Sequence, residues 1–179
     1  MPSVVFKLEQ FSDISDFERV STLTQFLHKA YKPLADAGFR AISTYQDDEK
    51  TKERIQKGEC WMATVNDELI GTILYRQPGN AGGNFWYLNP FVASIGQFAV
   101  KEQFQKQGIG AKLIEHTIGL ALRDGAHELA LDTAEGALYL VNYYSKLGFR
   151  HIGYCQWQHT NYRSVILSKQ LKEPPPVQD

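Results

Sequence analysis

One junction limits the fold of this chain more than any other feature: a strand-like run passes into a helix-like run through two closely spaced glycines. Residues 91–100 read as a central strand, and a helix is predicted from about Gly108 to Asp124, where Gly125 ends it. Residues 128–133 then read as another strand. This order predicts one strand–helix–strand crossover near the middle of the chain.

Helices and hairpins flank the crossover on both sides. Apolar residues alternate in the strand-like runs and recur every three or four residues in the helix-like runs. Strands are predicted at residues 4–8, 59–65, 69–77, 149–157 and 161–168, and helices at about residues 12–31, 47–58 and 136–147. The order β-α-α-β-β-β-α-β-α-β-β predicts an α/β fold on a mixed sheet. Residues 31–45, with Pro33 and Gly38, break the periodicity and are expected to cover a substrate cleft.

Length and composition favour one domain that needs neither a disulfide nor a metal. A chain of 179 residues can bury one sizeable core, so residues 1–172 are expected to form one domain. Residues 173–179, which include three consecutive prolines, are expected to form a disordered tail. The two cysteines and five histidines lack the spacing of a metal or redox site, so no metal is predicted.

Charge and hydropathy argue against two classes of partner. Nineteen Lys and Arg stand against twenty Asp and Glu, and the net charge of −1 gives no general attraction to nucleic acid or to an anionic membrane. No window approaches the length of a membrane span, and the first residues do not read as a secretion signal. We therefore expect a cytoplasmic protein with no nucleic-acid or membrane partner. The oligomeric state stays open, and a homodimer is one of the alternatives.

The two glycines at the junction are suited to binding phosphate. Gly108 and Gly110 remove side chains where the backbone approaches a ligand, and the first helical turn leaves N–H groups unpaired at the positive end of the dipole. Two common phosphate motifs do not fit, because the Walker loop and the dinucleotide fingerprint need glycines that this stretch lacks. What remains is the pattern Gln105-x-x-Gly108-x-Gly110, which suits a diphosphate.

This pattern resembles the signature of the GCN5-related N-acetyltransferases, the GNAT family: Gln or Arg, two residues, Gly, one residue, Gly or Ala. Residues 144–149, Tyr-Ser-Lys-Leu-Gly-Phe, resemble the second recurrent stretch of that family, and the predicted element order is the family's order. The resemblance covers nearly the whole chain. It implies a GNAT-like fold with about seven strands and four helices, acetyl-coenzyme A (acetyl-CoA) as cofactor, and direct transfer of the acetyl group to an amine.

The resemblance assigns the cofactor contacts to two adjoining segments. Backbone amides of the glycine loop are expected to hold the pyrophosphate of coenzyme A, and the preceding strand is expected to hydrogen-bond the pantetheine arm. The loop positions are Gln105, Lys106, Gln107, Gly108, Ile109, Gly110 and Ala111, and the strand positions are Phe98, Ala99 and Val100. The amide of Val100 is also expected to polarise the thioester.

The resemblance further implies that Tyr144 is catalytic and protonates the departing thiolate. A phenol with a pKa of about 10 is a sensible donor to a thiolate whose thiol has a pKa of about 8.5. The alternative is a packing aromatic, because Leu140, Tyr144 and Leu147 share one helical face. Tyr143 is rotated by about 100° around the helix and is expected to point elsewhere.

The group that accepts the proton of the amine is left open. At the positions where many family members carry an acid, this sequence has Gly96 and Gln97, and neither can act as a base. Asp132, His151 and water are the candidates. Asp132 is equally well explained as a solvated strand-end residue that caps the following turn, and His151 as an ordinary surface histidine.

Two functions follow from these arguments. The favoured one is transfer of an acetyl group from acetyl-CoA to the amine of a small molecule or a peptide. The alternative is a coenzyme A-binding sensor or interaction module without turnover, suggested by the missing acid at Gln97. The identity of the acceptor and the length of the acyl chain are not determined. The aromatic residues 85–87, Trp157 and Tyr162 are candidates either for lining an acceptor pocket or for packing.

Overall fold

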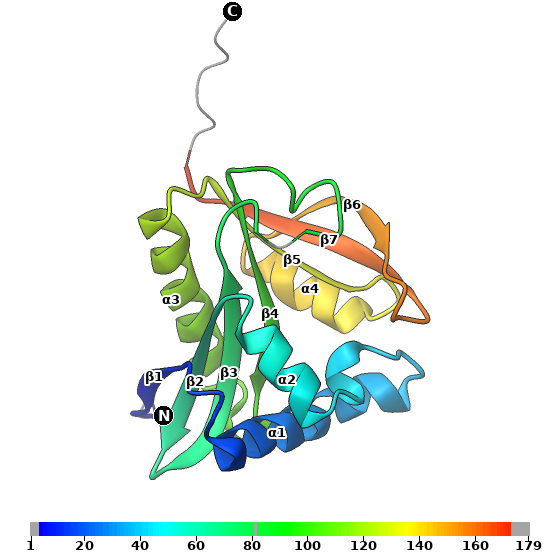
Figure 1. Cartoon of the computed structure of the whole chain (residues 1–179). Coiled ribbons are helices and arrows are strands. Elements are labelled where there is room, and N and C mark those ends of the chain that lie inside the picture. Colours follow the sequence, from blue (N-terminus) through cyan, green and yellow to red (C-terminus); the bar gives the residue numbers. More distant parts are fainter. Residues whose placement is uncertain (1–3, 81, 173–179) are drawn as a thin grey trace, which may run out of the picture.

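The computed structural model describes residues 4–80 and 82–172, so the expected tail at 173–179 lies outside the described residues. One sheet has the strand order β1-β2-β3-β4-β5-β7-β6 (Figure 1). Its strands are β1 (Lys7–Phe11), β2 (Glu59–Val65), β3 (Glu68–Arg76), β4 (Val92–Val100), β5 (Glu128–Ala134), β6 (Arg150–Gln156) and β7 (Arg163–Gln170). The helices are α1 (Phe17–Asp36), α2 (Asp48–Ile55), α3 (Ile109–Arg123) and α4 (Leu138–Lys146), with short 3₁₀ turns η1 (Ile42–Thr44) and η2 (Glu102–Phe104). The predicted mixed sheet with seven strands and four helices is confirmed.

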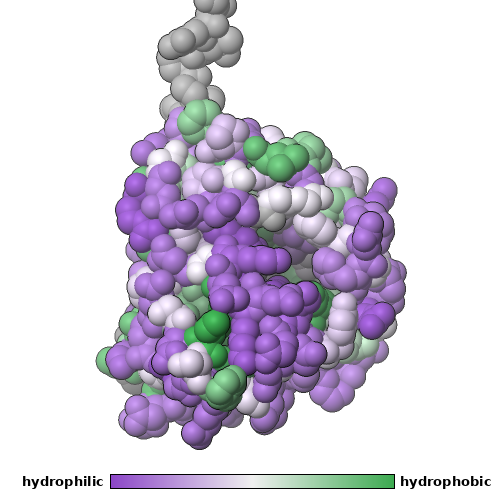
Figure 2. Space-filling model, viewed as in Figure 1, coloured by the Kyte–Doolittle hydropathy of each residue, from purple (hydrophilic) through white to green (hydrophobic). Residues whose placement is uncertain are grey.

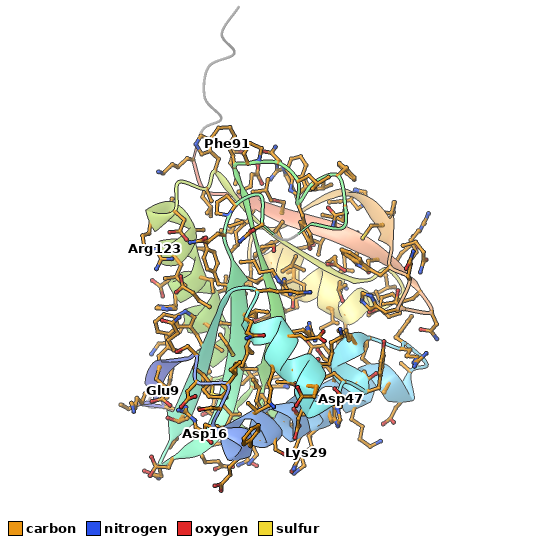
Figure 3. All side chains as sticks on the ribbon, in the orientation of Figure 1. Glu9, Asp16, Lys29, Asp47, Phe91 and Arg123 are labelled. Carbon is orange, nitrogen blue, oxygen red and sulfur yellow. The ribbon has the colours of Figure 1, made fainter. Side chains whose placement is uncertain are left out.

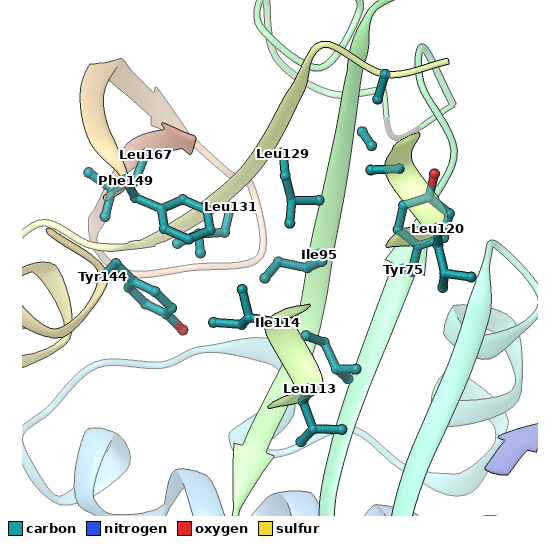
Figure 4. Close-up of a cluster of buried hydrophobic side chains, with 14 of the residues drawn as sticks. Tyr75, Ile95, Leu113, Ile114, Leu120, Leu129, Leu131, Tyr144, Phe149 and Leu167 are labelled. Carbon is teal, nitrogen blue, oxygen red and sulfur yellow. The ribbon is translucent and has the colours of Figure 1, made fainter. Parts of the chain in front are cut away.

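The helices cover both faces of the sheet. Successive side chains of a strand point to opposite faces, and β3 illustrates the division. Ile73 and Tyr75 pack in the core that includes residues of α3 and α4, whereas Leu74 packs with residues of α1 and α2. Figure 4 shows part of the first core, where α3 and α4 meet the strands. The sheet therefore lies between two apolar layers.

The crossover strands β4 and β5 are parallel, and they separate early. They pair only at residues 92–94 of β4 and 128–130 of β5. Beyond these pairs β4 stays bonded to β3 and β5 stays bonded to β7, so a gap opens between the two strands. A β-bulge in β4 accompanies the separation: Gln97 has a φ of 46°, and the register with β3 shifts between Gly96 and Ala99. The gap leaves one edge of β4 without a neighbouring strand.

The first helix is longer than the sequence indicates. The predicted end near Tyr31, just before Pro33, is wrong, because α1 continues to Asp36. Proline removes one N–H donor and crowds the preceding turn, but tertiary packing outweighs this local cost. Leu34 is only 4% exposed and belongs to a buried cluster with Ala41, Ala134 and Ala137. The extension carries the following segment to the gap between β4 and β5.

Gly58, between α2 and β2, leaves no room for a side chain. A Cβ atom there would lie 2.0 Å from the carbonyl oxygen of Tyr75 on β3. Because that oxygen belongs to the backbone of a buried strand, a change of rotamer does not relieve the clash. Gly58→Ala is expected to lower the free energy of unfolding by about 3 kcal/mol, measured by urea denaturation.

The matched control is Gly119→Ala, on the exposed side of α3. A Cβ atom at Gly119 has no neighbour within 4 Å, and alanine is the better helix former by about 0.5–1 kcal/mol. This variant is therefore expected to gain stability. Similar unfolding midpoints for the two variants would contradict the close approach of Gly58 to Tyr75.

Three features can be stated for the part of the chain that the structure describes. No helix there is long and apolar enough to cross a membrane. The same residues contain no group of three or more His, Cys, Asp or Glu side chains arranged to hold a metal ion. Cys60 and Cys155 are free thiols, the first buried and the second half-buried.

Candidate active site

The N-terminus of α3 presents free amide groups. Gly108 is the N-cap residue with a φ of 83°, a left-handed conformation that glycine adopts without strain, and no side chain caps the helix. The amides of Ile109, Gly110 and Ala111 are therefore available, since the first turn of a helix has no internal acceptors for them. Ile109 is 1% exposed and anchors the turn in the core, whereas Gly108 and Ala111 are exposed. An anion here would meet several N–H groups at the positive end of the helix dipole.

Gln105, the first residue of the signature, ties the loop to the end of β4. Its side-chain nitrogen donates to the carbonyl oxygen of Val100 over 3.0 Å. Lys106 follows with a φ of 61° and an exposed side chain. The side-chain nitrogen of Gln107 donates to the carbonyl oxygen of Gln103 over 2.9 Å. These bonds hold the loop in a tight turn whose last residues lead into the free amides of α3.

Gly110 allows a close approach between α3 and an aromatic pair. A Cβ atom there would lie 2.8 Å from the hydroxyl oxygen of Tyr143 and 3.2 Å from the ring of Phe98. The rings of Phe98 and Tyr143 stack with centroids 6.4 Å apart. Tyr143 thus points in a different direction from the buried Tyr144, and its partly exposed side chain reaches the start of α3 from α4. Both Tyr143 and Tyr144 lie next to Phe98, because α4 packs across the end of the gap.

The strand positions expected to hold the pantetheine arm lie along the gap, but not all face it. The amide of Lys101 donates to the carbonyl oxygen of Ile70 on β3 over 2.8 Å. Alternate residues of a strand direct their backbone groups to the same neighbour, so those of Ala99 also face β3. Phe98 and Val100 direct theirs into the gap.

Side chains already bond to the two carbonyl groups on this edge of β4. The hydroxyl of Tyr31, on α1, donates to the carbonyl oxygen of Phe98 over 3.1 Å, and Gln105 donates to that of Val100. The outward amides of Phe98 and Val100 have no strand partner, because β5 has turned away. They are the backbone donors that the gap offers.

Tyr144 projects from α4 into the core beside the gap. Its side chain is 8% exposed, and its ring centroid lies 5.8 Å from that of Phe149 and 6.2 Å from that of Phe98. In Figure 4 its hydroxyl points away from Phe149, toward Ile114 of α3. Burial raises the pKa of Tyr144 well above its usual value, and the nearby Tyr31 adds to this effect. The phenol therefore carries its proton at neutral pH, as a proton donor must.

A cavity of about 610 Å³ opens on the side of the sheet that carries α1 and α2. Its wall is formed by residues 41–47, by α2, by parts of β3, β4 and β5, and by the β6–β7 turn. Tyr31 belongs to this wall and also bonds to β4 at the gap, so the cavity and the gap adjoin. In Figure 2 the hydrophilic surface of α2 lies in the middle of the view, on one side of the cavity. The predicted cover from residues 31–45 therefore does contribute to a cleft.

Asp132 of β5 lies in this cavity, where two aromatic side chains hold its carboxylate. The hydroxyl of Tyr87 donates to one carboxylate oxygen over 2.8 Å, and the indole nitrogen of Trp157 donates to the other over 2.8 Å. Burial, together with the neighbouring carboxylate, raises the pKa of Tyr87 well above its usual value. His151, by contrast, is exposed on β6 and packs against Tyr154, outside the cavity wall. Of the two candidate bases, only Asp132 lies in the cavity.

The positions that would carry an acid in the resembling family have a different environment here. Gln97 is 1% exposed, and its side-chain oxygen accepts from Gln46 over 3.2 Å. The guanidinium of Arg76 lies against Gly96, where a Cβ atom would be 3.0 Å from the nearer terminal nitrogen. Arg54 of α2 lines the same cavity. This part of the wall is therefore positively charged.

Three residues of the site were not predicted from the sequence: Tyr31, Arg54 and Arg76. They come from α1, α2 and β3, and none belongs to a recurrent motif. The one signal in their neighbourhood was the expectation that residues 31–45 cover a cleft.

Comparison with known protein families identifies the family of the chain. The model of the acetyltransferase (GNAT) family matches residues 22–149 of the chain. The chain belongs to the GNAT family. The resemblance found in the sequence is thereby confirmed, and the protein is an acetyltransferase of this family.

Two curated relatives of this GNAT protein come from Bacillus subtilis (strain 168). The uncharacterized N-acetyltransferase YvbK is 31% identical over 98 residues, which span 55% of this chain and only 57% of YvbK. The S-(2-succino)cysteine N-acetyltransferase is 28% identical over 160 residues, which span 88% of this chain and 92% of that protein. The second match therefore includes nearly all the elements of the GNAT fold.

Solved GNAT structures share the fold. A GNAT acetyltransferase from Staphylococcus aureus Mu50 matches 94% of this chain and 100% of its own length, with a TM-score of 0.69 and 18% identity. A GNAT acetyltransferase from Elizabethkingia anophelis, solved with acetyl-CoA bound, matches 92% of this chain and 97% of its own length, with a TM-score of 0.61 and 18% identity. At such identities the likeness shows the common fold.

Proposed function

We propose that this GNAT protein transfers the acetyl group of acetyl-CoA directly to the amine of a small-molecule or peptide acceptor. The observation that carries the proposal is the uncapped N-terminus of α3, with Gly108 in a left-handed conformation and free amides behind it. A relative matched over most of its length is named for N-acetylation of S-(2-succino)cysteine, which supports an amine as acceptor.

The residues at the loop and the gap fit coenzyme A. The diphosphate would be held by the amides of Ile109, Gly110 and Ala111, with Lys106 and Gln107 in the turn before them. Gly108 leaves open space where another residue would place a Cβ atom. Gln105 would act indirectly, since its side chain holds the loop against β4.

Along the gap, the amides of Phe98 and Val100 would donate hydrogen bonds to the pantetheine arm. The arm would accept them in the place that a neighbouring strand takes elsewhere in the sheet. Ala99 would support this edge through its pairing with Thr72 of β3. When bound, acetyl-CoA supplies an acetyl group activated as a thioester. Each amide has one N–H, so the amide that lies at the thioester end of the arm, Val100 or Phe98, would donate to the carbonyl oxygen as negative charge develops there, and the other would bind the arm.

Two side chains would move protons in this mechanism. An amine with a pKa of about 10 is protonated at neutral pH, so a base must take its proton before attack. Asp47 and Asp132 both line the cavity, but Asp47 is used as the N-cap of α2. Asp132 would therefore take that role, directly or through water. Tyr144 would donate the proton that the departing sulfur needs.

Calorimetry followed by an acceptor survey tests this proposal. Coenzyme A and acetyl-CoA are titrated into the protein, and thiol release is then measured with S-(2-succino)cysteine, free amino acids, a polyamine and peptides with a free N-terminus. We expect micromolar binding and turnover of at least one amine. Binding without turnover of any amine would favour a coenzyme A sensor, and absence of binding would refute the proposal.

Asp132→Asn is expected to lower kcat/KM at least about tenfold at pH 7, because an amide does not accept the amine's proton. The deficit should shrink toward pH 10, where a large fraction of the acceptor is already deprotonated. The measurement is the pH profile of thiol release.

Asp67→Asn is the matched control for that profile. Asp67 is exposed in the β2–β3 turn with a φ of 64°, a conformation that asparagine adopts equally well. It should follow the unaltered protein at every pH. A deficit of Asp132→Asn that stays constant up to pH 10 would count against a role in proton removal.

A further inference from the structure

The cavity beside Asp132 contains two arginines that form no direct ion pair among the described residues, although Asp132 attracts both from a distance. Arg54 and Arg76 both line it, and neither takes part in an ion pair within residues 4–80 and 82–172. Four other arginines each pair with at least one carboxylate: Arg19, Arg123, Arg150 and Arg163. Arg40, the remaining arginine, also has no ion pair, but its guanidinium lies over the ring of Tyr45. The cavity is therefore the one place among the described residues where two arginines without an ion pair lie together.

Uncharged side chains position the Arg54 guanidinium and leave most of its N–H groups without a partner among the described residues. One terminal nitrogen of Arg54 donates to the hydroxyl of Ser43 over 2.9 Å and to the side-chain oxygen of Gln46. Gln46 is itself held by Thr51, whose hydroxyl accepts from its side-chain nitrogen over 2.7 Å. Since a guanidinium has five N–H donors, Arg54 is positioned by the protein and still able to bind an anion.

Arg76 is positioned by the shape of β4. A Cβ atom at Gly96 would lie 3.0 Å and 3.1 Å from its two terminal nitrogens. Glycine at this place therefore lets the guanidinium lie flat against the strand, at the wall of the cavity. Its donors have no carboxylate partner among the described residues, and burial lowers the pKa of Arg76. An anion bound here would offset that cost.

The remaining charges of the cavity do not cancel the pair. Lys50 and Lys57 also line it, against the carboxylates of Asp47 and Asp132. Asp47 is used as the N-cap of α2, where its carboxylate accepts from the amide of Lys50 over 2.8 Å. Lys50 pairs with Glu53 of α2, so Arg54, Arg76 and Lys57 face two carboxylates. Burial and the nearby Arg76 lower the pKa of Arg54 to about 10. The cavity has an excess of positive charge.

We infer that the acceptor is an amine that also carries one or more carboxylates, as a free amino acid or an amino dicarboxylate does, and that Arg54 and Arg76 bind its carboxylate. This inference rests on the proposed acetyl transfer. The ammonium group of such a ligand would lie next to Asp132, on β5 across the gap. The ligand's carboxylate would accept two parallel hydrogen bonds from a guanidinium group. A volume of about 610 Å³ is within the usual range for small-molecule sites. The N-terminal residue of a peptide has a peptide bond in place of the α-carboxylate of a free amino acid. A polyamine lacks carboxylates and carries further positive charges that the arginines repel.

Matched acceptors test the inference on the unaltered protein. L-glutamate, L-aspartate and S-carboxymethyl-L-cysteine are each compared with the fully amidated form of the same compound, which keeps the amine and removes the carboxylates. We expect kcat/KM for at least one acid to exceed that for its amide at least about tenfold. Equal or faster acetylation of the amides, or of a polyamine, would overturn the inference.

Arg54→Gln and Arg76→Gln test the two binding residues. Each is expected to raise KM for the acid acceptor at least about tenfold with kcat changed by less than about threefold, and to leave the slow rate with the amide unchanged. Arg54→Lys and Arg76→Lys keep the charge but lose the bidentate fork, so their KM should be intermediate. Lys29→Gln is the control, because Lys29 lies exposed on α1 and outside the cavity wall (Figure 3).

Two further readouts separate failure of this inference from failure of the proposed function. The affinity for acetyl-CoA and the thermal midpoint are measured for every variant, so a folding defect is recognised directly and the lysine variants then decide. If acetyl-CoA does not bind, or no amine of either kind is acetylated, the proposed function fails and this inference with it. If amines are acetylated but the arginine variants affect acids and amides alike, the acetyltransferase stands and the acceptor class is wrong.

Discussion

Gly108→Asp is expected to weaken coenzyme A binding at least about a hundredfold. The variant places a carboxylate at the positive end of α3, where the diphosphate would lie, and like charges at such a short distance repel strongly. A Cβ atom at Gly108 meets nothing within 4 Å, so the loss would come from charge and from occupation of the ligand's space rather than from a clash inside the protein. The measurement is calorimetric titration with coenzyme A.

Gly125→Asp is the matched control at the other end of the same helix. Gly125 has a φ of 79°, is exposed, and also has no neighbour within 4 Å of a Cβ atom. Both variants therefore carry the same charge change and the same left-handed strain, about 1 kcal/mol. The thermal midpoint should fall more for Gly125→Asp, because its carboxylate lies at the negative end of the helix dipole, yet only Gly108→Asp should lose binding. Equal affinities in the two variants would remove the helix start from the cofactor site.

Tyr144→Phe is expected to lower kcat about a hundredfold and to leave the affinity for acetyl-CoA unchanged. The substitution removes one oxygen atom and keeps the ring that packs against Phe149 and Phe98, so the core should be preserved. Burial raises the pKa of Tyr144, which makes the phenol a weaker acid. The same burial would raise the pKa of the departing thiol of coenzyme A. The two pKa values would therefore stay close, and the proton transfer from the phenol to the thiolate would cost little free energy.

Single-turnover rates and calorimetry check this prediction. Tyr154→Phe removes the same oxygen from an exposed residue of β6, 43% exposed, and should turn over like the unaltered protein. If Tyr144→Phe also keeps its kcat, Tyr144 is a packing aromatic and water or another group protonates the sulfur. If it loses affinity for acetyl-CoA without losing kcat, its role is in binding.

Local chemistry explains which parts of the structure were predictable. The signature loop was found because each of its demands is local: glycine where φ is positive, a helix start behind it, and a glutamine whose side chain bonds to the strand before it. The β2–β3 hairpin was found for the same reason. Its turn residues Asn66 and Asp67 have φ values of 48° and 64°, which these residue types tolerate.

Long-range packing explains the rest. The first strand is Lys7–Phe11, later than the predicted residues 4–8, because Phe11 pairs with Cys60 and is buried in the core beneath α1. The end of α1 beyond Pro33 packs in a cluster with Ala134 and Ala137, about a hundred residues away in the chain. No window of sequence brings such partners together, so propensity alone misplaces these boundaries.

The same limit applies to the site. Asp132 was one of several open candidates, and only the three-dimensional structure brings it into a cavity with Tyr87 and Trp157. Arg54 and Arg76 come from a charged helix and a strand end, where a charge is ordinarily solvated. Their shared cavity and missing carboxylate partners are properties of the fold and leave no trace in the spacing of the residues.

Because β4 and β5 pair over only a few residues, the sheet consists of two parts, β1 to β4 and β5 to β7, which we call panels; the short β4–β5 ladder that joins them is called the seam. The panel of β1 to β4, with α2 packed on it, carries Arg54 and Arg76, and the panel of β5 to β7 carries Asp132. Only three residue pairs form the backbone ladder between the two parts, and the rest of their contact is side-chain packing in one core. A small change in the angle between β4 and β5 would therefore alter the spacing between the arginines and the carboxylate. Substitutions along the seam, remote from every ligand atom, would thus retune which lengths of acceptor the enzyme accommodates.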